Sequence, residues 1–247
     1  MVEESKSPIR QTLDDQLISA IQKGSIDDIK KLINQGVDLN HKDRNGSTAI
    51  YSCSNDEQLN IARFLLSQGS ALNISNIRGN TPLHIAVERG SKEIILLFML
   101  NNADPSAVNA NGQKPEDLNQ EMKPLLWAIN KDRDSYRLLN ENQRKRLNQI
   151  FDDIDGDGTG QLDIAKSTKF NRFLEDDLPE DAARKDASDF IRDVSICKPG
   201  KVNLDEWLFS FSKLAAEMGS ESIDQFIEDY ERRIKEKGKF ADFRVRD

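Results

Sequence analysis

Oxygen-bearing side chains stand at every second position in one short segment of the chain. They are Asp155, Asp157, Thr159, Gln161 and Asp163. Carboxylate, hydroxyl and backbone carbonyl oxygens that a tight loop brings together are the ligands that calcium prefers in proteins. We therefore predict a candidate calcium loop, in which the first three residues bind through side chains, the fourth through its backbone carbonyl and the last through water.

Lys166 weakens this prediction. Counted from Asp155, it occupies the twelfth position of the loop, where calcium loops normally carry a glutamate that supplies two oxygens. An ammonium there removes both oxygens and repels a divalent ion. We therefore expect calcium binding to be weak or absent, and magnesium or high calcium to be held only weakly. Lys166 therefore favours the interpretation that the segment is a helix–loop–helix unit that keeps its geometry without metal.

The loop can be read in a second frame that starts at Asp153. That frame gives a more regular run of aspartates, but it places Gly160 where the loop needs an apolar residue. The frame that starts at Asp155 places Leu162 there, and it leaves the apolar residues of segment 147–154 on one face of the preceding helix. We therefore prefer the Asp155 frame.

A second, weaker loop spans residues 195–206. It carries Val202 at the position that Leu162 has in the first loop, so these two residues are expected to face each other in a short antiparallel ladder. Cys197 and Pro199 stand where ligands would be needed, so no metal is expected in this loop. Together the two loops resemble a degenerate pair of EF-hands, the helix–loop–helix units that bind calcium.

Apolar residues from Ile223 to Ile234 fall on one face of a helix predicted for residues 222–237. The resemblance to paired EF-hands implies an apolar groove that receives amphipathic helices. The expected walls of this groove include Phe190, Trp207 and Phe211. Either the helix fills the groove of its own chain, or it presents its apolar face to another protein, and both alternatives remain open at this point.

A glycine recurs every 33 residues in the first half of the chain, at Gly46, Gly79 and Gly112. The block around the second of these reads GNTPLHIAVERG and resembles the ankyrin repeat. A fixed period near 33 residues is typical of stacked units that bury their apolar faces against each other. We expect three to four repeats, with Tyr51 in the place of a histidine in the second repeat and Trp127 packed on the last.

The resemblance to ankyrin repeats implies a surface that binds other proteins. We expect this surface to lie on the loops that join the repeats. The candidate partner-binding residues are His41, Arg44, Asn45, Ser75, Arg78, Asn109 and Asn111.

Composition excludes several other classes of function. The net charge is −8 over 247 residues, and neither half of the chain carries the basic excess of a nucleic-acid-binding protein. The apolar run at residues 94–100 is far shorter than the roughly 20 residues that span a bilayer, and the first residues lack an apolar leader. We therefore expect a cytoplasmic protein that binds neither nucleic acid nor membrane.

Catalytic patterns are absent from the sequence. The chain has two histidines, and we expect His84 to serve a structural hydrogen bond in its repeat and His41 to lie in a loop without a nearby nucleophile. No phosphate-binding glycine loop and no serine-nucleophile motif occurs. We therefore predict that the protein is not an enzyme and has no catalytic residues.

The sequence as a whole predicts an all-α chain of three parts. These are an ankyrin-repeat solenoid at residues 11–135, an EF-hand pair at 140–218 and a C-terminal amphipathic helix at 222–237. The combination resembles ankyrin repeat and EF-hand domain proteins, which implies a non-enzymatic adaptor or scaffold with protein partners on the ankyrin surface and in the EF-hand groove. Some members of that family are structural parts of the ciliary axoneme, so the resemblance implies a cytoskeletal or ciliary assembly. The alternative function is a calcium-responsive sensor.

Overall fold

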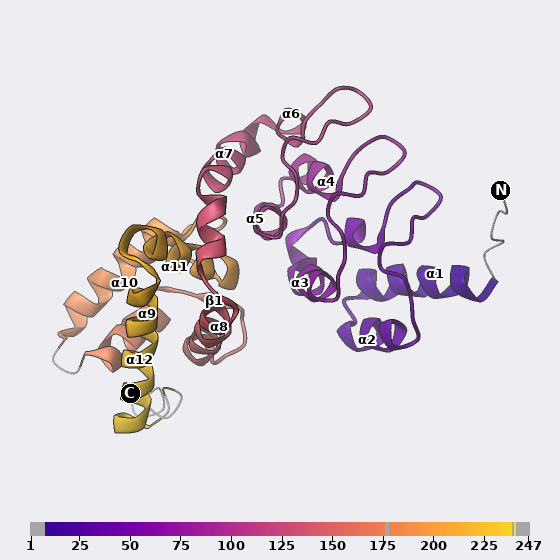
Figure 1. Ribbon diagram of the computed structural model, residues 1–247. Helices are drawn as coiled ribbons and strands as arrows, with labels where there is room; N and C mark the ends of the chain where they lie inside the picture. The colour runs from indigo at the N-terminus through magenta and orange to yellow at the C-terminus, as the bar shows by residue number, and fades with distance from the viewer. Residues whose placement is uncertain (1–7, 176–177, 239, 241–247) are drawn as a thin grey trace. The chain divides into compact units, whose positions relative to one another are not determined.

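The computed structural model describes residues 8–175, 178–238 and 240 (Figure 1). Most of these residues are helical, which confirms the prediction of a helical chain. The chain divides into two compact units between Asn130 and Lys131.

The first unit consists of short helices joined by longer loops. Its elements are α1 (Pro8–Lys23), α2 (Ile26–Asn34), the 3-10 helices η1 (Ala49–Ser52) and η2 (Asp56–Gln58), α3 (Leu59–Ser67), α4 (Pro82–Arg89), α5 (Lys92–Leu100), α6 (Pro115–Leu118), the 3-10 helix η3 (Gln120–Met122) and α7 (Lys123–Asp132), which continues past Asn130. Three loops project side by side from these helices (Figure 1). We call residues 35–48, 68–81 and 101–114 the first, second and third finger.

The third repeat shows why its residues form a helix pair. Pro82 fits the first turn of α4, where no backbone N–H is needed. The Nδ1 atom of His84 accepts a hydrogen bond from the backbone N–H of Thr81 at 3.1 Å and so caps the helix. Helix α5 is buried from Glu93 to Leu100, and it therefore lies in the core of the unit.

The second repeat differs because its first helix is a single 3-10 element, η1. Ala49 replaces the proline of the third repeat, and Tyr51 replaces the histidine that closes the cap. Thr48 accordingly has no side-chain cap. The Tyr51 hydroxyl lies 2.6 Å from the carbonyl oxygen of Asn80, so it joins the repeat to the second finger instead.

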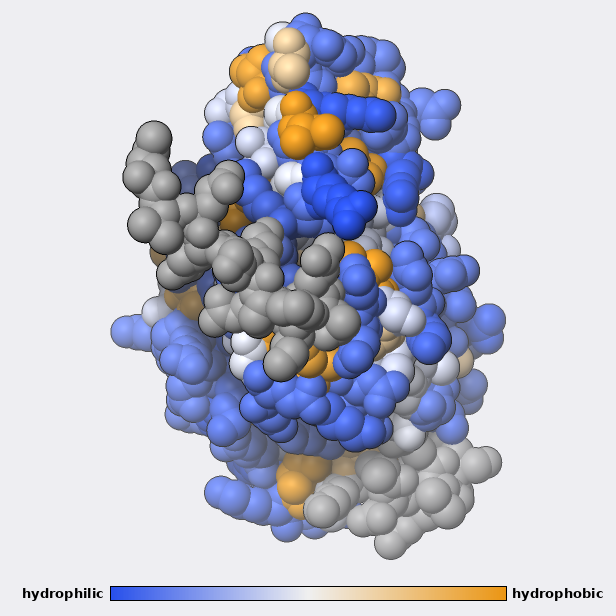
Figure 2. Space-filling view, turned by 90° about the vertical axis from the view of Figure 1, so that its right-hand side faces the viewer, coloured by the Kyte–Doolittle hydropathy of each residue, from blue (hydrophilic) through white to orange (hydrophobic). Residues whose placement is uncertain are grey.

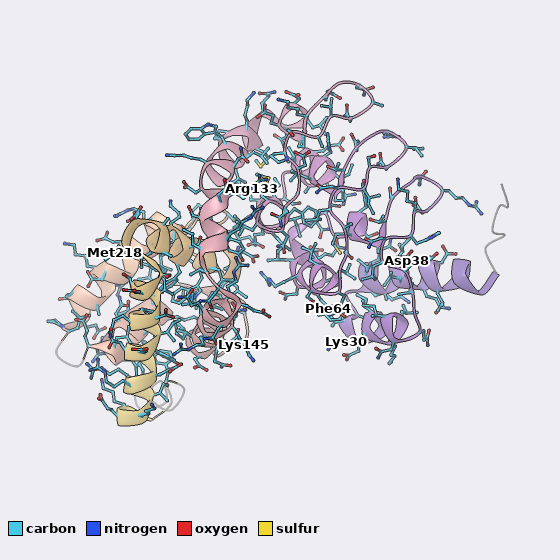
Figure 3. All side chains as sticks on the ribbon, in the orientation of Figure 1. Lys30, Asp38, Phe64, Arg133, Lys145 and Met218 are labelled. Atoms are coloured by element: carbon cyan, nitrogen blue, oxygen red, sulfur yellow. The ribbon has the colours of Figure 1, made fainter. Side chains whose placement is uncertain are left out.

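Adjacent repeats are joined at 33-residue intervals. The Oδ1 atom of Asn40 accepts a hydrogen bond from the backbone N–H of Ala71 at 2.8 Å, and Asn73 makes the corresponding bond to the following repeat at 2.9 Å. Lys30 on α2 lies with its Nζ atom 5.9 Å from the centre of the Phe64 ring on α3 (Figure 3). These contacts agree with the nearest-neighbour stacking that a repeat period predicts.

Helix α7 corrects the expectation for Trp127. Met122, just before the helix, and Leu126 and Ile129 within it are buried, and their spacing places them on one face. Trp127 lies on another face and is 68% exposed. The indole therefore does not pack into the end of the solenoid.

The second unit contains two helix–loop–helix segments and a final helix. Its elements are η4 (Arg133–Leu138), α8 (Glu141–Asp155), β1 (Gln161–Leu162), α9 (Ile164–Leu174), α10 (Glu180–Val194), β2 (Val202–Asn203), α11 (Leu204–Met218) and α12 (Ser220–Lys237). Strands β1 and β2 pair antiparallel with Leu162 opposite Val202. The predicted ladder between the two loops is therefore confirmed.

An aromatic core holds the second unit together. The ring of Trp207 lies 4.8 Å from that of Phe211 and 5.8 Å from that of Phe190, measured between centroids. On α12, Ile227 and Tyr230 are buried, and residue Phe226 places its ring 4.8 Å from Phe211. The apolar face of α12 thus packs on its own unit, which is the first of the two alternatives for this helix.

Candidate functional site

Each finger is closed by one polar side chain. The Oδ1 atom of Asn76 accepts hydrogen bonds from the backbone N–H groups of Arg78 at 2.9 Å and Asn80 at 3.1 Å. Asp43 and Asn109, which lie 33 residues to either side, make the same pair of bonds in their fingers. These residues fix the finger turns, and their common spacing is the signal in the sequence that reveals this role.

The fingers are joined edge to edge by backbone hydrogen bonds. The N–H of Ile77 donates to the carbonyl of Asn45 at 2.9 Å, and the N–H of Ala110 donates to the carbonyl of Arg78 at 3.0 Å. A Cβ atom on Gly79 would lie only 2.6 Å from the nitrogen of Ala110. The recurring glycine therefore permits this close approach, and the three fingers form one ordered surface.

The structure places most of the predicted partner-binding residues on the exposed part of this surface. The exposed ones are Arg44, Asn45, Ser75, Arg78 and Asn111. His41 is half-buried, with Nε2 3.4 Å from the carboxylate of Asp14. Asn109 is 8% exposed, and its side chain is engaged inside the turn, so it supports the surface. Ile77, which we did not predict, is 71% exposed at the tip of the second finger.

His84 connects its helix to the third finger. Its Nε2 atom lies 3.1 Å from the carbonyl oxygen of Gln113. Since Nδ1 accepts from Thr81, Nε2 carries the proton of the neutral ring and donates to this carbonyl. Burial lowers the pKa of His84 from its ordinary value, and the hydrogen bond to Gln113 opposes this only in part.

We expect the first unit to lose stability as the pH falls below about 6.5, the pKa of an unfolded histidine. Below that value the unfolded chain binds a proton that buried His84 does not, so unfolding becomes more favourable. Between the pKa of an unfolded histidine and the lower pKa of folded His84, the unfolding free energy falls by about 1.4 kcal/mol for each pH unit. Below the pKa of folded His84 the loss stops. Urea unfolding at several pH values measures this. His84→Gln should lack the loss, whereas His41→Gln, which changes the other histidine, should retain it.

In the loop at residues 155–166, the Nζ atom of Lys166 lies among the oxygens predicted to bind calcium. It is 2.7 Å from Oδ1 of Asp155, 2.6 Å from Oδ1 of Asp157 and 2.8 Å from Oγ1 of Thr159. The carbonyl oxygen of Gln161 lies 2.9 Å away. A loop whose oxygens already surround an ammonium does not fit calcium, because the calcium ion would have to displace the ammonium.

Asp163 acts differently from its predicted role. Its Oδ1 atom accepts a hydrogen bond from the backbone N–H of Lys166 at 2.9 Å and so caps the start of α9. Asp153 lies in α8, where it accepts a hydrogen bond from the hydroxyl of Tyr230 at 2.5 Å. The four oxygens around Lys166 therefore belong to the frame that starts at Asp155.

Charge pairing shifts the pKa values in this loop. The pKa of the Asp157 carboxyl lies well below its ordinary value, chiefly because Lys166 donates a hydrogen bond to it. Burial would lower the pKa of Lys166, but the bonds to Asp155 and Asp157 outweigh burial and raise it. Lys166 is therefore an ammonium at neutral pH.

The second loop is closed by Glu206, whose carboxylate accepts three backbone hydrogen bonds. The N–H groups of Ile196 and Cys197 donate to Oε1 at 2.6 Å, and that of Asn203 donates to Oε2 at 2.9 Å. Burial raises the pKa of Glu206, and these hydrogen bonds oppose the rise. This loop turns N–H groups inward, so it does not offer an oxygen cage. Across the part of the chain that the structure describes, no cluster of three or more His, Cys, Asp or Glu side chains is arranged to hold a metal ion.

The second unit also has an apolar cavity of about 720 Å³. Phe190, Trp207 and Phe211 line it, as predicted for the groove, and Phe226 of α12 lines it as well. The cavity is thus bordered by the final helix and is not completely filled by it.

Hydrophilic residues cover most of the face shown in Figure 2, and apolar residues appear there as small separate patches. Each helix within the described residues is too short or too polar to cross a bilayer.

Comparison with protein families identifies repeats in the first unit. A family model of ankyrin repeats, in three copies, matches residues 17–109. The putative E3 ubiquitin-protein ligase XBAT34 of Arabidopsis thaliana is 34% identical over 98 residues, which are 38% of this chain and 26% of the relative. The palmitoyltransferase ZDHHC13 of Mus musculus is 25% identical over 97 residues, or 39% of this chain and 16% of the relative.

The oxysterol-binding protein-related protein 1 of Mus musculus is 49% identical over 57 residues, which are 22% of this chain and 6% of the relative. The chain therefore spans about a quarter or less of the length of these curated relatives. The matched repeats, the 33-residue period and the bonded fingers agree with one another. Residues 17–109 are ankyrin repeats, a non-enzymatic fold that serves as a protein–protein interaction module.

Proposed function

We propose that this chain is a non-enzymatic adaptor that binds a protein partner on the surface of its three fingers. The observation that carries this proposal is the edge-to-edge bonding of the fingers, which holds Arg44, Arg78 and Asn111 on one ordered surface. A surface that is ordered before binding loses little conformational entropy when the partner docks. Several of the relatives have enzyme names, but only a small share of each relative is matched.

The exposed side chains of the fingers suggest the chemistry of the partner. Arg44 and Arg78 lie on adjacent fingers, and the apolar side chain of Ile77 stands beside the second arginine. Two cations and an apolar contact complement an acidic protein segment that also carries apolar side chains. We infer a partner of this kind.

The double substitution Arg44→Glu/Arg78→Glu is expected to weaken partner binding at least about tenfold, because it places like charges across the interface. The measurement is quantitative co-purification from the cells that express the protein, followed by titration of the recovered partner. The matched control is Lys23→Glu/Lys31→Glu, which makes the same change of charge at exposed residues of α1 and the adjacent α2. If both double variants lost the same amount of partner affinity, or if neither lost any, the fingers would be ruled out as the binding surface.

We propose that the second unit is a degenerate EF-hand pair that serves as a static platform. Support comes from the paired helix–loop–helix segments and from the opposition of Leu162 and Val202. A second partner would bind in the apolar cavity beside Trp207. The alternative of a calcium sensor predicts that a chelator changes partner binding. Binding that is indifferent to chelator supports the adaptor, and a chelator-dependent change supports the sensor.

The cellular setting belongs to the same proposal. The combination of repeats and EF-hand-type loops resembles proteins among which some build the ciliary axoneme, and we propose a cytoplasmic location with a place in a cytoskeletal or ciliary assembly. Detergent extraction of cells that express the tagged chain tests this. Retention of the chain in the detergent-resistant fraction agrees with the assembly, and full release contradicts it.

A further inference from the structure

The ammonium of Lys166 is surrounded by oxygens of the loop that also contains it. Four residues contribute an oxygen within 2.9 Å of Nζ, and all four are the residues that a calcium loop would use. The lysine side chain is 16% exposed, and that of Asp155 is 6% exposed. We propose that this ammonium is the resident cation of the loop, which replaces a divalent ion and keeps the loop closed without metal.

The remaining bonds of the loop are complete around this ammonium. Besides Lys166, Asp155 accepts hydrogen bonds from the hydroxyl of Thr159 at 2.8 Å and from the backbone N–H of Gly160 at 2.7 Å. The two carboxylates at Asp155 and Asp157 would repel each other without a cation between them. Lys166 provides that cation, and its three N–H protons are shared among the four oxygens.

A tethered cation has an advantage over a dissolved one. Lys166 belongs to the same loop as its ligands, so its effective concentration is in the millimolar range or above. Resting and signalling calcium is far more dilute than that. If calcium bound, the displaced ammonium would stay nearby because it belongs to the same loop, and the two cations would repel each other. The inference rests on the proposed static platform and supplies its mechanism: the loop is closed at every calcium concentration of the cell.

Two substitutions at Lys166 test the inference. In Lys166→Met the ammonium is lost and the two carboxylates are left unbalanced, so we expect the unfolding equilibrium constant of the second unit to rise at least about tenfold in chelator. Millimolar calcium should reverse much of this loss, because the oxygen cage becomes available. In Lys166→Glu the missing ligand is restored, and one calcium per chain should bind with a Kd on the order of 10⁻⁵ to 10⁻³ M.

The measurements are isothermal calcium titration and thermal unfolding of the full chain, each with and without chelator. The wild type should show no calcium heat in the range where Lys166→Glu binds. Lys169→Glu makes the same change of charge one turn further along α9, and it should behave as the wild type. If Lys166→Glu does not fold, Lys166→Met still decides the question through its stability and its response to calcium.

Two results would overturn the inference. One is a wild-type chain that binds one calcium below millimolar concentration and loses this binding in Asp155→Asn. The other is a Lys166→Met chain that unfolds as the wild type does, which would mean that the ammonium does not hold the loop. Neither result bears on the fingers, because the Arg44→Glu/Arg78→Glu pair tests the adaptor surface separately.

Discussion

In Gly79→Ala the first unit is expected to lose about 3 kcal/mol of unfolding free energy, whereas Gly112→Ala should lose about 1 kcal/mol. Both glycines have positive φ, 73° and 75°, so alanine strains the backbone to a similar degree at each. At Gly79 the new Cβ would also meet the nitrogen of Ala110 at 2.6 Å. At Gly112, apart from the glycine itself and its two chain neighbours, no described residue has a heavy atom within 4 Å of that position. The difference between the two variants therefore measures the close approach of the fingers.

Urea unfolding gives the free energies, and amide hydrogen exchange gives the local effect. The N–H of Ala110, bonded to the carbonyl of Arg78, should lose protection in Gly79→Ala and keep it in Gly112→Ala. Gly46→Ala should have an intermediate effect, since its Cβ would lie 3.0 Å from the nitrogen of Ile77. Equal costs at Gly79 and Gly112 would mean that the fingers do not pack as closely as the structure indicates.

The repeat could be predicted from the sequence, but the reason for its glycines could not. The period of Gly46, Gly79 and Gly112 is visible in one chain, whereas the distance from Gly79 to Ala110 depends on how two repeats stack. Asn76 shows the opposite case. Asp43, Asn76 and Asn109 also recur every 33 residues, so their shared role in closing the fingers could have been recognised from the sequence. The exposed position of Trp127 also could have been recognised, from its helical offset to Leu126 and Ile129.

The position of Lys166 shows a different limit of sequence reasoning. The pattern identified the residue as one that repels calcium, and it correctly predicted the pairing of Leu162 with Val202. The position of the ammonium could not be predicted, because the flexible four-carbon stem of lysine can point toward solvent or into the loop. Only the assembled loop brings Nζ between Asp155 and Asp157.

Glu206→Ala is expected to lower the unfolding free energy of the second unit by about 3 to 5 kcal/mol. The substitution leaves three N–H groups, those of Ile196, Cys197 and Asn203, without their acceptor, and each buried unsatisfied group costs about 1 to 3 kcal/mol. Water that enters the cavity left by the side chain recovers part of this cost. Urea unfolding followed by the fluorescence of Trp207, in a Trp127→Phe background, measures the loss in this unit.

Matched variants isolate the role of the carboxylate. Glu217→Ala removes an exposed carboxylate from the same helix and should change stability by less than about 0.5 kcal/mol. Glu206→Gln keeps one oxygen but turns an NH₂ group toward backbone N–H donors, so its cost should lie between those of the two alanine variants. Added calcium should not restore Glu206→Ala, because N–H groups line this loop, whereas it should restore Lys166→Met. Rescue of Glu206→Ala by calcium would contradict the conclusion that Glu206 closes the second loop by accepting hydrogen bonds from its backbone N–H groups.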